Sequence, residues 1–101
     1  MNVQFFKRMF PDAAYFLAVV FHQDWAEDFN SPATAVRGFI DRETAALVKA
    51  VVSDLTRLEV TEVASRDLDE ILLRVGCYYD YAQQGVSAKE WLKQVAGWLG
   101  Q

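Results

Sequence analysis

One histidine and one cysteine are the side chains of this 101-residue sequence best suited to acid–base or nucleophilic chemistry. His22 and Asp24 stand two positions apart in a polar stretch, and a histidine beside a carboxylate is what a general base requires. Cys77 would be the nucleophile that such a base activates. However, no serine, second histidine or set of metal ligands accompanies this pair. Cys77 stands among valine and tyrosine residues, as a small buried side chain does, so we predict no catalytic residues and no enzyme.

The other motifs that carry chemistry are missing from the sequence. It contains no HExxH, CxxC or EF-hand pattern for a metal ion, and its five glycines form neither GxGxxG nor a phosphate-binding loop. A single cysteine excludes an internal disulfide, which favours a reducing compartment. The apolar run at residues 13–21 is too short to span a bilayer, and no signal-cleavage site follows it. We therefore expect no metal, no cofactor, no membrane contact and a cytoplasmic location.

Composition and charge narrow the class of partner. With 52% hydrophobic and 24% charged residues, the chain has the composition of a globular protein. Its length suits a single domain over residues 1–101. The formal net charge of −4 argues against direct binding to nucleic acid, which needs a basic surface. The same charge suits a basic protein partner.

Acidic residues gather in two stretches of the sequence. Residues 24–43 hold five acids and two bases, and residues 59–70 hold five acids and one base. These stretches are either solvated helix faces and helix starts or binding surfaces for a cationic partner. In the second hypothesis the contact residues are Glu27, Asp28, Asp41, Glu43, Glu62, Asp69 and Glu70. A similar choice, between core packing and a binding hot spot, is open for Tyr78, Tyr79 and Tyr81.

Five helices are expected to position these residues, because start and stop signals divide the chain into five segments of helical periodicity. The helices begin near Pro11, Ser31, Arg42, Ser65 and Ser87. The clearest covers residues 42–58, with one apolar stripe that ends at Leu58, while Asp54 and Arg57 fall off this stripe. Gly76 is placed to end the fourth helix in a left-handed turn. Ser87 and Glu90 form a capping box at the start of the last helix.

Evidence for strands is thin. Residues 60–63 and 77–81 carry β-branched or aromatic side chains, but both stretches are short and neither adjoins a hairpin turn sequence. We therefore predict an all-α fold, with a single compact domain of about five helices. A short two-stranded element at these two stretches is the alternative.

The segment Phe21-His22-Gln23-Asp24-Trp25, which we call the HQDW motif, resembles the signature of a family of immunity proteins. This family belongs to contact-dependent growth inhibition systems. The resemblance extends from about Tyr15 to Leu99. It includes Ser31-Pro32 and, near the end of the chain, a G-x-S-x-x-x-W-L pattern that contains Trp91. One departure is that Asp80 and Tyr81 stand where we expect a turn that contains proline.

The resemblance implies a function. Proteins of this family protect the producing bacterium by binding the toxic C-terminal domain that sibling cells deliver, often a nuclease, and by covering its active site. The partner would then be the cognate toxin domain, bound stoichiometrically and without turnover. We expect this chain to be a monomer that binds neither nucleic acid nor a membrane.

The resemblance also suggests a role for the HQDW motif. Paired toxins and immunity proteins diverge together at their contact surfaces, so a motif shared across a family is better explained as structural. In this interpretation Phe21, Trp25 and Trp91 belong to the scaffold, with Trp25 buried. His22, Gln23 and Asp24 tie the loop to helix ends by hydrogen bonds. Toxin contacts would then come from the acidic stretches, with Glu27 and Asp28 as the first choices.

Two rival functions remain at this stage. A generic helical adaptor or regulatory module of unknown partner would have an apolar groove in place of an acidic surface. A small hydrolase would use His22, Asp24 or Cys77, and its turnover would be lost on His22→Ala.

Overall fold

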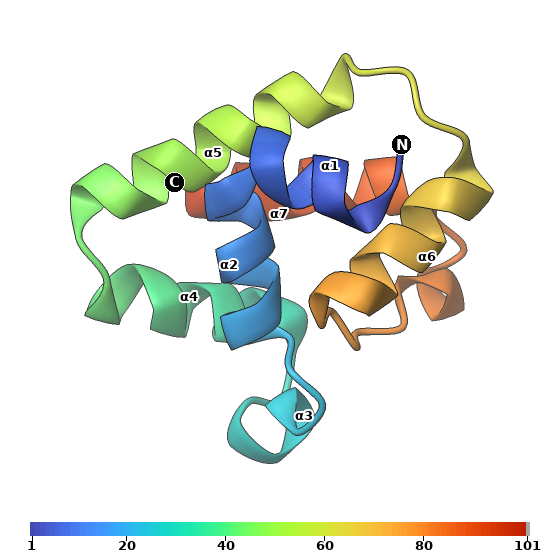
Figure 1. Cartoon of the computed structure of the whole chain (residues 1–101). Helices are drawn as coiled ribbons and strands as arrows, with labels where there is room; N and C mark the ends of the chain where they lie inside the picture. Colours follow the sequence, from blue (N-terminus) through green and yellow to red (C-terminus); the bar gives the residue numbers. More distant parts are fainter. Residues whose placement is uncertain (101) are drawn as a thin grey trace.

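All regular structure in residues 1–100, which the computed structural model describes, is helical (Figure 1). In chain order the elements are α1 (Val3–Met9), α2 (Pro11–Val20), α3 (Trp25–Asp28), α4 (Pro32–Arg42), α5 (Ala45–Glu59), α6 (Ser65–Val75), the 3-10 helix η1 (Tyr81–Gln84) and α7 (Ala88–Leu99). The predicted all-α class is therefore confirmed. Within the same residues, no helix is long and apolar enough to cross a membrane.

Helix α2 is central to the packing. It contacts α1, α4, α5 and α6, while α7 packs against both α5 and α4 on the other side of the core (Figure 1). Helix α1 also lies against α6. The result is one compact domain with principal extents of 31 × 30 × 20 Å. Only α3 stands away from this assembly, in the connection between α2 and α4 (Figure 1).

Several helices begin and end at the residues that the sequence signals predict. Pro11 and Pro32 occupy the first turns of α2 and α4. The Ser87 hydroxyl accepts a hydrogen bond from the Glu90 N–H, and the Glu90 carboxylate accepts one from the Ser87 N–H, which completes the capping box. Gly76 ends α6 with φ +103°, a conformation that other residues rarely adopt.

The predicted number of helices was too low. The additional helices are α1, which buries only Phe6, and α3, which is a single turn of four residues. Neither is long enough to produce a helical period in the sequence. The third predicted helix also begins later than residue 42, because Thr44 caps α5 by accepting a hydrogen bond from the Leu47 N–H.

The alternative two-stranded element was wrong, since residues 1–100 contain no strand. Residues 60–63 form the turn after α5, and Val60 is 82% exposed. In residues 77–81, the Tyr78 N–H donates to the Phe21 carbonyl at 2.7 Å, so this stretch pairs with the end of α2 and not with residues 60–63.

Aromatic side chains fill much of the core. Phe16 lies edge-on to Phe39, with ring centroids 4.9 Å apart, and Phe21 lies edge-on to Trp91 at 5.1 Å. All four side chains are fully buried. Edge-to-face pairs of this kind add about 0.5–1.5 kcal/mol each to the free energy of area burial.

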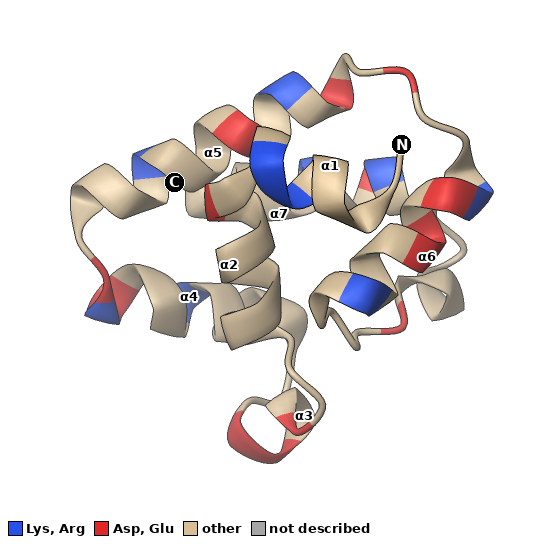
Figure 2. Ribbon diagram, in the orientation of Figure 1, with Lys and Arg blue, Asp and Glu red and all other residues tan. Residues whose placement is uncertain are grey.

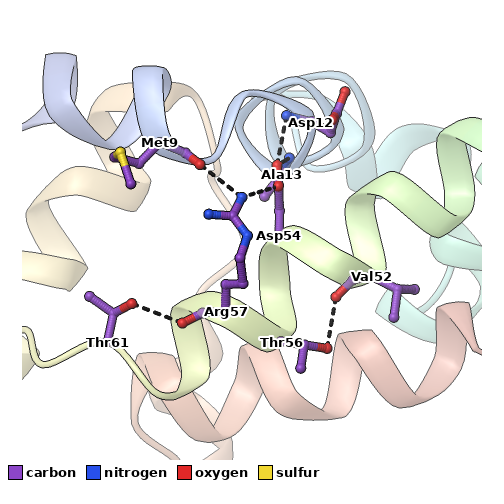
Figure 3. A network of polar contacts seen from close by, with 8 residues as sticks. All are labelled: Met9, Asp12, Ala13, Val52, Asp54, Thr56, Arg57 and Thr61. Atoms are coloured by element: carbon purple, nitrogen blue, oxygen red, sulfur yellow. Dashed lines mark hydrogen bonds and ion pairs between the residues drawn. The ribbon is translucent and has the colours of Figure 1, made fainter.

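Asp54 of α5 is buried, contrary to the prediction from the sequence. It falls off the apolar stripe, so an exposed side chain was expected, yet it is only 5% exposed. One carboxylate oxygen of Asp54 accepts hydrogen bonds from the N–H groups of Asp12 and Ala13, at 2.9 and 3.0 Å (Figure 3). These are two of the N–H groups at the start of α2 that no carbonyl of that helix can satisfy. Asp54 therefore caps α2 from another helix.

Arg57 completes this network. Its guanidinium donates to the other Asp54 oxygen at 2.7 Å and to the Met9 carbonyl, at the end of α1, at 2.9 Å (Figure 3). The same guanidinium lies over the Phe10 ring, 5.0 Å from its centroid. The pair thus fastens the corner between α1 and α2 onto α5.

Replacing Asp54 by alanine should therefore destabilise the fold. Asp54→Ala leaves the N–H groups of Asp12 and Ala13 without an acceptor and Arg57 without its partner, at a cost of about 2–4 kcal/mol. The control Asp41→Ala removes an exposed acid and should stay within about 0.5 kcal/mol of the parent. Urea unfolding followed by circular dichroism measures both differences. Equal unfolding midpoints for Asp54→Ala and the parent would contradict the capping role.

Candidate functional site

The HQDW motif joins segments that are far apart in the sequence. Phe21 is fully buried at the end of α2, and its ring contacts both Trp25 and Trp91, with centroids 5.9 and 5.1 Å apart. Tyr79 contacts the same two tryptophans, at 5.4 and 5.2 Å. An aromatic cluster thus binds the loop after α2 to α7 and to the segment after α6. Trp25 itself is half-buried, at the edge of this cluster, where a buried side chain was expected.

Of the polar residues of the motif, His22 ties the loop together. Its Nδ1 atom accepts a hydrogen bond from the Asp24 N–H at 3.1 Å, and its Nε2 atom lies 3.7 Å from a carboxylate oxygen of Asp28. The side chains of Gln23 and Asp24 differ from the expectation. Both are exposed, and within residues 1–100 neither forms a side-chain hydrogen bond.

Phe29 anchors the far end of the same loop. Its ring lies so close to Gly38 of α4 that a Cβ atom built on Gly38 would stand 2.9 Å from two ring carbons. A side chain at position 38 would therefore displace the Phe29 ring from this place. An isolated glycine inside a helix is a sequence signal of a close contact. The sequence could not show that the contacting residue is Phe29, nine positions away. With Trp25 and Phe29 both docked, α3 presents Glu27 and Asp28 to solvent.

The structure does not gather the other acidic candidates into two patches (Figure 2). Asp41 and Glu43 lie at the opposite end of α4 from α3, and Glu43 stands 3.9 Å from Arg42. Glu62 lies in the connection between α5 and α6. Asp69 and Glu70 lie on α6, where Glu70 pairs with Arg74 at 3.0 Å. The acidic candidates thus occupy four separate places.

A cleft lies between α6 and the chain that follows it. Its volume is about 380 Å³, and its lining includes Leu72, Tyr78, Tyr79 and Tyr81. The Tyr81 hydroxyl donates a hydrogen bond to Asp69 across the cleft. Burial, and then this hydrogen bond, raise the pKa of Tyr81, so its hydroxyl stays protonated at neutral pH.

Cys77 lies in the wall of this cleft but is only 4% exposed. Burial raises the pKa of its thiol to about 12, so the nucleophilic thiolate is scarce at neutral pH. The part of the chain that the structure describes also contains no group of three His, Cys, Asp or Glu side chains placed to hold a metal ion.

The sequence model of the CdiI immunity proteins matches residues 9–99. The chain belongs to the CdiI immunity protein family. The fold resembles a chain in the crystal structure of a CdiA-CT/CdiI complex from Y. kristensenii 33638, with a TM-score of 0.82 and 25% sequence identity. That likeness covers 90% of this chain and 98% of the other. No curated protein matches the sequence significantly.

This match confirms the family inferred from the sequence. It does not bear on the HQDW motif, whose use as the family signature stays a prediction. It likewise leaves open which of the acidic CdiI residues contact a partner.

The two tryptophans of the aromatic cluster should contribute unequally to stability. Trp91 is fully buried, and Trp91→Ala should lower the free energy of unfolding by about 3–5 kcal/mol. Trp25 is half-buried, so Trp25→Ala should cost only about 2 kcal/mol. Denaturant unfolding of the two variants measures the difference. An equal or larger loss for Trp25→Ala would show that the loop supports the core more than its exposure indicates.

Cys77 should react slowly in the folded protein. Because the thiol is buried and its pKa is about 12, alkylation by iodoacetamide at neutral pH should be at least about 100-fold slower than in denaturant. Mass spectrometry of timed samples gives both rates. Rapid labelling of the native protein would reopen the case for chemistry at this thiol.

Proposed function

We propose that this CdiI protein protects its cell by binding the C-terminal toxin domain of a cognate CdiA protein. The observation that carries the proposal is membership of the CdiI immunity protein family over residues 9–99. The likeness to a chain from a CdiA-CT/CdiI complex, over almost all of that chain, supports the same partner. The protein would act in the cytoplasm, where the delivered toxin has its target.

The inhibition is stoichiometric and involves no turnover. The two candidate catalytic groups support this, because the Cys77 thiol is buried with a raised pKa and His22 is engaged in the contacts of its own loop. Protection would then come from physical cover of the toxin's active site, as the family resemblance implies. We expect the toxin to be a nuclease, since a surface that binds phosphates is basic and attracts a protein of net charge −4.

The connection between α2 and α4, residues 21–31, which we call the α3 loop, is the acidic surface best suited to this contact. It projects from the domain and carries Asp24, Glu27 and Asp28, all exposed (Figure 2). Trp25 and Phe29 dock both sides of the loop, so its shape exists before binding. A preformed loop loses little conformational entropy on association, which favours affinity. The family match over residues 9–99 favours this function over the generic adaptor hypothesis.

Reversing the charge of the α3 loop should weaken the complex. In the variant Glu27→Lys, Asp28→Lys, like charges would meet across the interface, and binding should weaken by about 2–5 kcal/mol if the charges are desolvated. The fold should persist, because exposed charges contribute little to stability. Calorimetric titration against the C-terminal toxin domain of the cognate CdiA protein measures the loss.

A matched control is the variant Asp41→Lys, Glu43→Lys, which changes the net charge equally at the opposite end of α4. It should slow association at low salt, and this effect should vanish at high salt because long-range steering is screened. A large loss of affinity for this control alone would move the interface to the α4–α5 turn. No binding by the parent would contradict the proposed function itself.

A further inference from the structure

The cleft beside α6 has features that its role in the fold does not require. Tyr78 stands at its edge with 49% of its surface exposed, and Leu73 with 55%. Large apolar side chains left this exposed at the rim of a concavity are typical of an interaction site. The interior is apolar, with Leu72, Cys77 and Val86 among its lining residues.

All the charged residues that line the cleft are acidic. Asp69 and Asp80 line it, and none of its lining residues is a lysine or an arginine. Asp69 is oriented by the Tyr81 hydroxyl. Asp80 is exposed and forms no ion pair within residues 1–100. Two carboxylates beside an apolar, aromatic interior complement a side chain with a long apolar stem and a cationic end.

Arginine fits this environment better than lysine. Its planar guanidinium stacks on the face of a tyrosine ring, and the half-exposed Tyr78 at the edge of the cleft offers such a face. The guanidinium also forms paired hydrogen bonds with carboxylates and is more weakly hydrated than an ammonium group. A cavity of about 380 Å³ has room for one such side chain.

The segment that forms one wall of the cleft also contacts the first residues of the α3 loop. The Tyr78 N–H donates to the Phe21 carbonyl at 2.7 Å, and the Tyr79 ring contacts Trp25 at 5.4 Å. The chain after α6 therefore lies directly beside the loop that carries Glu27 and Asp28. A protein that covers this loop would reach the cleft as well.

We propose that the cleft between α6 and residues 77–88 is the subsite that receives an arginine side chain of the toxin domain. The inference rests on the proposed function and names a second part of the same interface. In this arrangement the α3 loop meets the basic surface of the toxin, and the cleft fixes the register of the complex through one anchored residue.

The first test compares two cleft variants with two matched controls. Tyr78→Ala and Asp80→Asn should each raise the dissociation constant for the C-terminal domain of the cognate CdiA protein by at least about 10-fold. Tyr15→Ala removes another exposed tyrosine (46% exposed), and Asp67→Asn removes an acid of α6 outside the cleft. Both controls should stay within about 2-fold of the parent. All four variants should remain folded, and the two tyrosine variants should lose similar, small amounts of thermal stability because both side chains are about half exposed.

The second test identifies the occupant. Each arginine and lysine of the toxin domain is replaced by alanine and combined with Asp80→Asn in a double-mutant cycle. One arginine should be strongly non-additive with Asp80→Asn, because either substitution alone already empties the subsite.

The outcomes separate the two proposals. Coupling to a lysine, or additive effects for every arginine, would overturn the cleft assignment. Full affinity of Tyr78→Ala and Asp80→Asn would also overturn it, while binding by the parent leaves the proposed function intact. Absence of binding by the parent would overturn the proposed function, and the cleft assignment with it.

Discussion

The carboxylate of Asp54 is the contact on which the arrangement of the first two helices depends. Helix α2 begins at Pro11, directly after α1, and its N-cap residue Phe10 has no side-chain acceptor. The N–H groups at this start are covered by other helices and need an acceptor from outside. Asp54 supplies it from α5, and Arg57 satisfies the Met9 carbonyl from the same side. Because α2 contacts α1, α4, α5 and α6, its position determines where its last residue, and the loop beyond it, can lie.

The aromatic cluster at the other end of α2 positions the surface loop that follows this helix. Phe21 is packed between Trp25, Tyr79 and Trp91, so the α3 loop, the segment after α6 and α7 meet at one place. The cluster leaves one buried donor, the Trp91 indole N–H, without a partner within residues 1–100. Such a group costs about 1–3 kcal/mol, which the burial of several rings offsets. Contacts of Trp25 and Phe29 with the rest of the domain thus hold the α3 loop in place, although its outer residues are exposed.

The tertiary structure, and not the order of residues in the sequence, decides which acidic segments lie near each other. Asp28 lies in the α3 loop and Asp80 lines the cleft beside α6. These two segments are distant in the sequence, yet a hydrogen bond from the Tyr78 N–H to the Phe21 carbonyl joins them. Conversely, Asp28 and Asp41 belong to one acidic stretch of the sequence but lie at opposite ends of α4. A partner contacts a surface of the folded protein and not a stretch of its sequence. The net charge of a stretch therefore indicates the sign of the partner's charge but not the point of contact.

The sequence by itself determined the family, the all-α class and most helix boundaries, because these depend on local chemistry. A proline or serine at a helix start, the glycine at position 76 and the apolar stripe of α5 act within one or two turns of the chain. Only the tertiary structure decided the burial of Asp54, the close contact of Phe29 with Gly38 and the meeting of the α3 loop with the cleft. Each of these joins residues that no helical period relates. Asp54 is the clearest case, because an acid off the apolar stripe is exposed unless the start of another helix lies against it.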